Sequence, residues 1–346
     1  IKRQRLIYAG IAVVLIGATL AFVSFFAKWG DFGYWIRRIF FLPLPFCLVI
    51  ALNEVCKKIA PKQPKLSRKV FGFFSFGNPS SIANLAALDI DTGNYTGAEK
   101  LLSKAVKSIN RKKKPHDYIA TYSYLAAIRA NTGKLAEADR QIVRLLEMAT
   151  NHYQIRTNDV NSTLLATTLI HASTVADLKD DARTALLLVS RALELLSAQK
   201  TPPVDLLITA LATTGYLKNL TGLYADALPH LSKAKEIWTR LPDARESLAV
   251  FIETNIGIAH MGCGRIAESE KHIKEALDRA RAPLGKKELP RVFHAKAILE
   301  SVNSLMSEAD TSYKEGIAAC ESQKPADSLQ LVRILREYSD FLEGTG

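Results

Sequence analysis

The sequence predicts an all-α solenoid of about six helix-turn-helix repeats, with an N-terminal transmembrane hairpin and a C-terminal capping helix. First, residues that favour turns recur at nearly regular spacings of roughly 40–47 residues, as expected for helical repeats. Second, small and large apolar residues occupy fixed places relative to these turns. Third, a long uncharged stretch precedes the repeats. The turn positions are Gly93, Gly133, Asp180, Gly222, Gly264 and Ser304.

The first element is a membrane anchor in residues 1–56. Residues 6–26 carry no charge and are numerous enough to cross a hydrocarbon core of about 30 Å as a helix. A second apolar segment, residues 39–55, contains Pro43 and Pro45, so it either spans as a kinked helix or forms a re-entrant piece. A basic start also fits a cleaved signal peptide, but the first apolar run exceeds the usual core of about 7–15 residues. We therefore expect a hairpin.

The charge distribution supports this topology and argues against nucleic acid as a partner. The net charge is +12, yet residues 1–75 hold 12 Lys and Arg against two acidic residues, so the remainder is nearly neutral. Basic residues flank both apolar segments, as expected where they stay on the cytoplasmic side of a membrane. This predicts an integral protein of a bacterial inner membrane, with its repeats in the cytoplasm.

Residues 57–79 form a basic and then aromatic juxtamembrane linker. Lysine stems and phenylalanine rings suit the headgroup layer, so we expect contact with anionic lipid. The alternative is that the rings cover the open end of the first repeat. The candidate lipid-contact residues are Lys57, Lys58, Lys62, Lys65, Arg68, Lys69, Phe71, Phe73 and Phe74.

The repeats occupy residues 80–325 and are defined by rows of small residues. The places seven residues before and five residues after each turn hold only Ala, Ser or Gly, which lets two helices approach closely. The place nine residues after each turn holds a large apolar residue that can fill the groove between helices. These last residues are Leu102, Ile142, Val189, Leu231, Ile273 and Tyr313.

This pattern resembles the tetratricopeptide repeat (TPR), a helix-turn-helix unit with small residues at such places. The usual period is about 34 residues, and the longer spacing here resembles the kinesin-light-chain type. HEAT or armadillo arrays have a period of about 40–47 residues, but the small-residue rows favour the TPR. The third copy deviates most, because Asp180 replaces Gly and Ala182 replaces a large residue two places later.

Residues 326–346 are predicted to form a capping helix and tail. Leu329, Val332, Leu335, Tyr338 and Leu342 recur at helical spacing and are expected to face the last repeat. Such a helix ends a solenoid.

The resemblance also implies a concave surface that binds a protein segment. The row nine residues before each turn would line it, and an Asn there can bond an extended backbone. The candidate groove residues are Asn84, Tyr124, His171, Thr213 and Asn255, with Lys218 nearby.

No catalytic, cofactor or metal motif stands out, so we expect a non-enzymatic scaffold, adaptor or accessory subunit that binds a protein at a membrane complex. The alternative is a self-assembling structural or transport-complex subunit whose apolar segments form the interface, which would make the chain a homo-oligomer.

Overall fold

The structure, a computed structural model, describes Ala86, Asp89, Ile90 and residues 93–241, 245–282, 285–323 and 328–345. The chain divides into two compact units, residues 1–63 and 64–346, and every described residue belongs to the second. The expected membrane hairpin and juxtamembrane linker lie outside the described residues. None of the helices that are described combines the length and apolar character needed to cross a bilayer.

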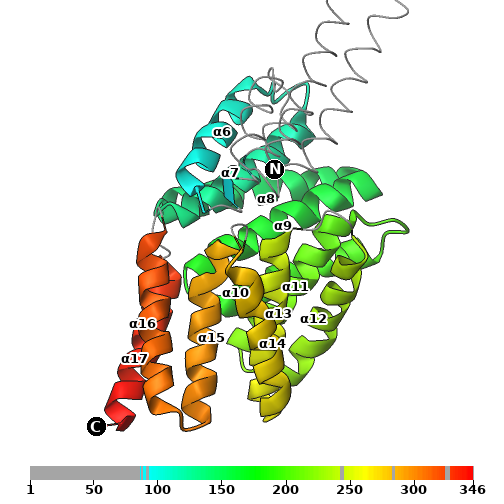
Figure 1. Ribbon diagram of the computed structural model, residues 1–346. Helices are drawn as coiled ribbons and strands as arrows, with labels where there is room; N and C mark the ends of the chain where they lie inside the picture. The colour runs from blue at the N-terminus through cyan, green and yellow to red at the C-terminus, as the bar shows by residue number, and fades with distance from the viewer. Residues whose placement is uncertain are drawn as a thin grey trace, which may run out of the picture. The chain divides into compact units, whose positions relative to one another are not determined.

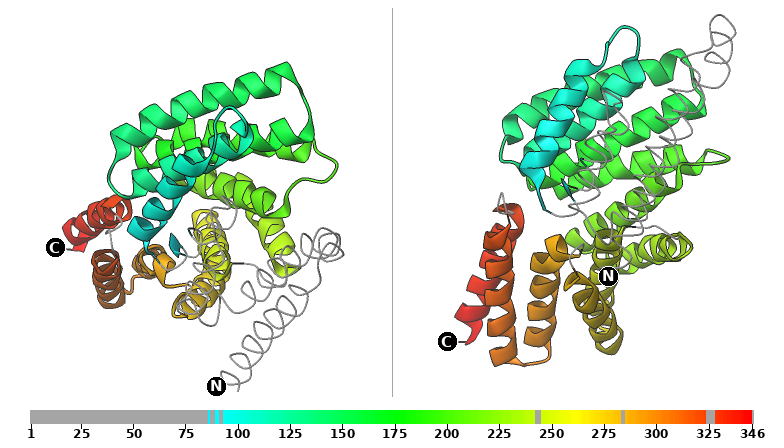
Figure 2. Two further views of the ribbon diagram at one scale, coloured as in Figure 1. Left: turned by 90° about the horizontal axis from the view of Figure 1, so that it is seen from above. Right: turned by 45° about the horizontal axis from the view of Figure 1, so that its top comes forward.

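The described part of the chain is helical throughout and contains no strand. Its α-helices alternate as the first and second members of hairpins, each packed against its neighbours along the chain (Figures 1 and 2). Several first helices also contact the next first helix, namely α7 with α9, α11 with α13, α13 with α15, and α15 with α17. The helices are α6 (Tyr95–Ser108), α7 (Pro115–Asn131), α8 (Leu135–Ile155), α9 (Asp159–Leu178), α10 (Ala182–Ser197), α11 (Val204–Leu220), α12 (Tyr224–Thr239), α13 (Glu246–Gly262), α14 (Ile266–Ala280), α15 (Leu289–Val302), α16 (Met306–Ser322) and α17 (Ser328–Thr345), with a short 3₁₀ turn, η2 (Lys286–Glu288), before α15.

All six predicted turn residues adopt the left-handed backbone conformation that ends a helix. Their φ angles lie between +60° and +83°, and Asp180 and Ser304 adopt it without being glycine. At every turn the next residue donates its N–H to a carbonyl five residues back, as Leu223 does to Lys218 at 2.8 Å. This satisfies a carbonyl that the helix end would otherwise leave free. The third repeat therefore has the same turn geometry as the others.

The small-residue rows are buried, and they pack on the large apolar row within each hairpin. Ala98, Ala138, Ala185, Ala227, Ser269 and Ala309 are all fully buried. In the fourth repeat Gly215 of α11 lies directly on Leu231 of α12, and in the fifth Gly257 of α13 lies on Ile273 of α14. The predicted close approach of the two helices is thus confirmed.

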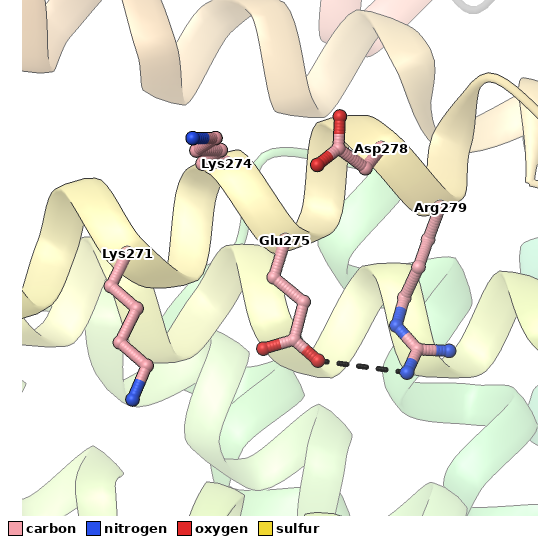
Figure 3. A pocket seen from close by; sticks show the side chains of 5 residues that line it. All are labelled: Lys271, Lys274, Glu275, Asp278 and Arg279. Atoms are coloured by element: carbon pink, nitrogen blue, oxygen red, sulfur yellow. Dashed lines mark ion pairs between the residues drawn. The ribbon is translucent and has the colours of Figure 1, made fainter.

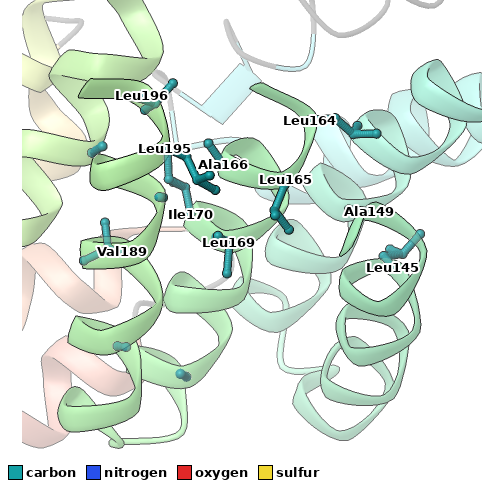
Figure 4. Close-up of a cluster of buried hydrophobic side chains, with 14 of the residues drawn as sticks. Leu145, Ala149, Leu164, Leu165, Ala166, Leu169, Ile170, Val189, Leu195 and Leu196 are labelled. Atoms are coloured by element: carbon teal, nitrogen blue, oxygen red, sulfur yellow. The ribbon is translucent and has the colours of Figure 1, made fainter. Parts of the chain in front are cut away.

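The largest hydrophobic cluster surrounds α9, which is sandwiched between α8 and α10 (Figure 4). Leu164, Leu165 and Leu169 of α9 pack with Leu145 of α8 and Leu196 of α10. Each such leucine contributes about 1.5–3 kcal/mol by leaving water. The stack is continuous because a hairpin shares its core with the hairpins on either side.

The capping helix is α17, but its buried face differs from the predicted one. Ile334 is fully buried, and Leu331, Tyr338 and Phe341 pack with it against α15 and α16. The expected stripe was wrong at Val332, Leu335 and Leu342, which are about half exposed. Aromatic packing explains the shift, since the ring of Tyr313 lies 5.1 Å from Tyr338 and 5.4 Å from Phe341.

Candidate functional site

Two of the predicted groove residues, Tyr124 and His171, are brought together. They belong to the first helices of the second and third repeats, and their rings stack at 5.2 Å with an interplanar angle of 11°. His171 Nδ1 also shares a hydrogen bond with Ser123 Oγ at 2.9 Å. Burial lowers the pKa of His171 to about 4, so the ring is neutral at physiological pH.

The other predicted groove residues are less accessible or lie elsewhere. Asn255 is 1% exposed, its amide donates to the Phe251 carbonyl at 2.7 Å, and Asn219 donates to its backbone carbonyl at 2.8 Å. A buried amide in this state cannot bond a partner's backbone. Thr213 and Lys218 are half-buried on α11, and Asn84 lies outside the described residues.

Arg129 and Glu300, which both lie four residues before a turn, make contacts within the chain. Arg129 pairs with Glu137 at 2.8 Å and with Glu99 at 3.5 Å. Glu300 accepts from Lys296 at 2.6 Å and from the Ser312 hydroxyl at 2.6 Å. These side chains tie neighbouring helices together.

Another group of side chains links the first helices across the repeats. We call Asp177, Tyr216, Phe251, Arg291 and Arg333 the axial cluster; they come from α9, α11, α13, α15 and α17. Arg333 donates to the Tyr216 hydroxyl at 2.5 Å and to Asp177 Oδ1 at 3.0 Å. The Tyr216 hydroxyl in turn donates to Asp177 Oδ2 at 3.0 Å. Residues up to 156 positions apart in the chain are thereby joined.

The aromatic side of the axial cluster is covered by a second arginine. The Arg291 guanidinium lies 4.8 Å from the ring centre of Tyr216 and 5.1 Å from that of Phe251, within the range of cation–π attraction. Arg333 is only 14% exposed. Burial raises the pKa of Tyr216, so its hydroxyl stays protonated and can donate to Asp177. Side chains of α9, α11, α13, α15 and α17 thus meet on the side of the stack that the first helices form, which we call the inner side.

Sequence reasoning missed the axial cluster, although a signal for it exists. Arg333 lies 42 residues after Arg291, and Phe251 lies 42 residues after Thr209. The central turns, such as Asp180 and Gly222, are separated by the same interval. Phe251, Arg291 and Arg333 therefore hold equivalent places in successive first helices, whereas Asp177 and Tyr216 lie closer to their turns. The cap α17 is, by this measure, one more first helix, and that is the feature the sequence prediction lacked.

In the part of the chain that the structure describes, one set of side chains brings metal-ligand types close together. Atoms of Glu253, His272 and Glu275 lie within 4.8 Å of one another. Lys235 already approaches both carboxylates, at 2.7 Å from Glu253 and 3.7 Å from Glu275, and His272 bonds Glu253 at 2.8 Å. Burial alone would raise the pKa of Glu253, but the bonds from His272 and Lys235 lower it. The set is an ion-pair network among α12, α13 and α14.

A shallow depression lies next to this network on the outer surface of α14. It is lined by Lys271, Lys274, Glu275, Asp278 and Arg279, all from that one helix (Figure 3). Arg279 pairs with Glu275 at 3.5 Å and with Glu246 at 2.8 Å. With mixed charges and a single wall, the depression has no convergent set of polar groups for chemistry.

The candidate lipid contacts, from Lys57 to Phe74, all lie outside the described residues.

The exposed surface of the second helices carries isolated apolar side chains. Val143 of α8 is 52% exposed and Leu187 of α10 is 73% exposed. Single apolar residues of this kind are common on protein surfaces.

Known structures place the fold among helical repeat proteins. The chain is similar to a signal transduction ATPase with a tetratricopeptide repeat sensor from Pyrococcus horikoshii, with a TM-score of 0.51 and 14% identity. That alignment covers 93% of this chain and 52% of the other, so this chain spans about half of its length. BtubC (BKLC) from P. vanneervenii aligns with a TM-score of 0.42 and 16% identity over 60% of this chain and 85% of the other.

The apo form of RapI aligns with a TM-score of 0.48 and 13% identity, over 76% of this chain and 94% of the other. No protein-family model and no curated protein sequence matches the chain. At so low an identity, the likeness to the tetratricopeptide sensor protein shows the fold alone. The chain thus has a TPR-like solenoid fold, an architecture suited to protein interaction.

Proposed function

We propose that this protein is a membrane-anchored, non-enzymatic adaptor that holds a protein partner at a membrane complex. The observation that carries the proposal is the solenoid itself, in which six turns share one geometry and the small residues five places after each are fully buried. Such a stack presents first helices side by side as one extended surface, which suits a protein ligand better than a small molecule. The long spacing of its copies favours the kinesin-light-chain type of TPR.

The anchor would restrict the encounter with the partner to the membrane. Residues 6–26 are long and apolar enough to span, and residues 57–69 supply the basic flank that anionic lipid attracts. Confinement of both proteins to one bilayer raises their effective concentration, so a modest affinity for the partner is sufficient. We place the repeats on the cytoplasmic side of a bacterial inner membrane.

The first test is to purify the full chain from its native membrane in mild detergent, weigh the intact complex and identify its subunits. A foreign subunit in a fixed ratio supports the adaptor. A complex of this chain alone overturns it in favour of the self-assembling alternative.

Once a partner is identified, a pair of threonines can test whether it binds the inner surface. Thr209 of α11 shares the repeat position of Phe251 in the axial cluster, whereas Thr311 lies on the outer helix α16. In both, the hydroxyl bonds the carbonyl four residues earlier, at 2.7 and 3.0 Å. Thr209→Arg should reduce capture of the partner at least tenfold, while Thr311→Arg should not. Equal capture by both variants would move the binding surface to another face.

Sidedness can be tested with a thiol reagent that does not cross membranes. Cys263 is exposed at the turn between α13 and α14 and is not in a disulfide. Labelling of Cys263 only after the cells are permeabilised supports repeats in the cytoplasm. Labelling in intact cells places them outside. The Cys263→Ser variant shows which part of the signal belongs to this residue.

A further inference from the structure

Contacts in a solenoid usually join neighbouring repeats. The axial cluster differs, since it joins helices that are not neighbours in the stack. α17 packs on α15 and α16, whereas its connection to α9 and α11 is made by the Arg333 side chain. Arg336 adds only a long approach of 4.0 Å to Asp180. Arg333 is the α17 residue whose side chain bonds both Asp177 and Tyr216.

That guanidinium is bound by groups that fit it closely. Asp177 offers a carboxylate at 3.0 Å, Tyr216 a hydroxyl at 2.5 Å, and Asp180 a second carboxylate at 3.4 Å. Arg333 and Asp177 are 14% and 17% exposed, so solvent screens their attraction only in part. Hydrogen bonds to charged groups that are shielded from water are the strong ones.

The rest of the solenoid gives little resistance to opening between these two points. The backbone contacts of each hairpin are mainly with its neighbours along the stack, so small rotations at successive interfaces add up. A solenoid of this kind can open by a small change at each of several interfaces, with no core disrupted. The side-chain bridge is then the contact that decides whether the inner side is closed.

We propose that Arg333 is an intramolecular latch that keeps the inner surface of the third to sixth repeats closed, so that a partner reaches this surface only when the bonds of Arg333 to Asp177 and Tyr216 open. The inference rests on the proposed adaptor function, because it concerns access to the surface where a partner would bind. It deepens that function by adding regulation: the free protein occupies its own binding surface.

Hydrogen exchange of the free full-length protein, followed by mass spectrometry, tests the latch without a partner. Arg333→Ala should speed exchange in α17 and also in the C-terminal turn of α9 and in α11, about tenfold or more, as expected from losing hydrogen bonds to charged groups. Exchange in α6 and α8 should not change. Arg336→Ala is the matched control, since Arg336 lies one turn along the same helix and is largely exposed.

Two further variants separate a latch from a loosened cap. Tyr216→Phe keeps the ring under Arg291 and removes the hydroxyl, so it should speed exchange in the same three segments by a smaller factor. The double variant Asp177→Arg with Arg333→Asp reverses the ion pair and should restore slow exchange. The proposal is overturned if Arg333→Ala behaves as Arg336→Ala does, or if its faster exchange is confined to α16 and α17. Because no partner is involved, failure of the adaptor function would be seen separately, in the composition of the purified complex.

Discussion

Gly215 and Leu231 approach so closely that a Cβ atom on Gly215 would lie 2.4 Å from Leu231 Cγ. This contact joins the two helices of the fourth repeat, and its counterpart between Gly257 and Ile273 joins those of the fifth at 2.6 Å. Glycine inside a helix is ordinarily a disadvantage of about 1 kcal/mol relative to alanine. Here the missing methyl group is what allows the second helix to fit.

Gly215→Ala should therefore destabilise the protein although it improves helix propensity. Overpacking a tight core costs about 1–3 kcal/mol, which exceeds the gain in propensity. We expect a lower midpoint of thermal unfolding by circular dichroism. Gly344→Ala is the control, because no atom lies within 4 Å of its added methyl group. If the unfolding midpoint of Gly215→Ala were equal to or above that of the wild type, the two helices could move apart at no cost in stability.

Ser304→Gly should stabilise the sixth repeat. Ser304 has a φ of +60°, and the left-handed conformation costs a residue with a Cβ about 1–2 kcal/mol. Part of this gain is offset by the greater freedom of glycine in the unfolded chain, so we expect a net gain of about 0.5–1 kcal/mol. Ser307→Gly, in the first turn of α16, should instead lower stability. Urea unfolding curves can compare the two variants. A lower free energy of unfolding in both would contradict backbone strain at Ser304.

The neutral state of His171 should make stability depend on pH. Its pKa is about 4 in the folded protein and near 6.5 in the unfolded chain, so the unfolded state binds a proton first as the pH falls. The contribution is complete above about pH 6.5 and is lost progressively down to about pH 4, by up to about 3 kcal/mol.

Urea unfolding at pH 7.5, 5.5 and 4.5 can measure this loss. The difference in unfolding free energy between the wild type and His171→Gln should shrink as the pH falls. Burial also lowers the pKa of His230 on α12, so the difference for His230→Gln should shrink in the same direction and serves as a second case. A difference for His171→Gln that stays constant over this range would show that the ring is not kept neutral by burial.

Lys235 should stabilise the protein only while Glu253 is charged. Glu253 is 5% exposed, and removing its lysine leaves a buried carboxylate with His272 as its remaining hydrogen-bond partner. We expect Lys235→Met to cost about 3 kcal/mol and the double variant with Glu253→Gln to recover much of that loss. A double-mutant cycle in urea measures the coupling. Additive effects would mean that the two groups do not depend on each other.

Much of the fold could be predicted from the sequence because its determinants are local. The turn residue, the small residues and the large apolar residue of each copy all belong to one hairpin, and each is found where the spacing places it. Asp180 shows that the position of a residue within the repeat predicts the turn better than its residue type does. Aspartate takes the left-handed conformation there because the Asp181 amide bonds the Ala176 carbonyl at 3.0 Å.

The candidate site was less predictable, because side-chain access depends on contacts between distant repeats. Asn255 holds the expected place in its helix, yet Asn219 from the neighbouring first helix covers its carbonyl. His171 is packed because Tyr124 of the preceding repeat stacks on it. Nothing in the spacing of the turns gives the rotation between hairpins, and this rotation decides which residues of a row meet. The partner-binding role of this row stays a prediction.

The bridge from Arg333 to Asp177 also changes how the molecule should come apart. A linear array usually unfolds from its ends, one copy at a time, because each copy is stabilised by its neighbours alone. Here the last helix and the third repeat share a contact that spans 156 residues, so neither can be lost without weakening the other. The third to sixth repeats and the cap should therefore melt as one cooperative block, while α6 is free to fray.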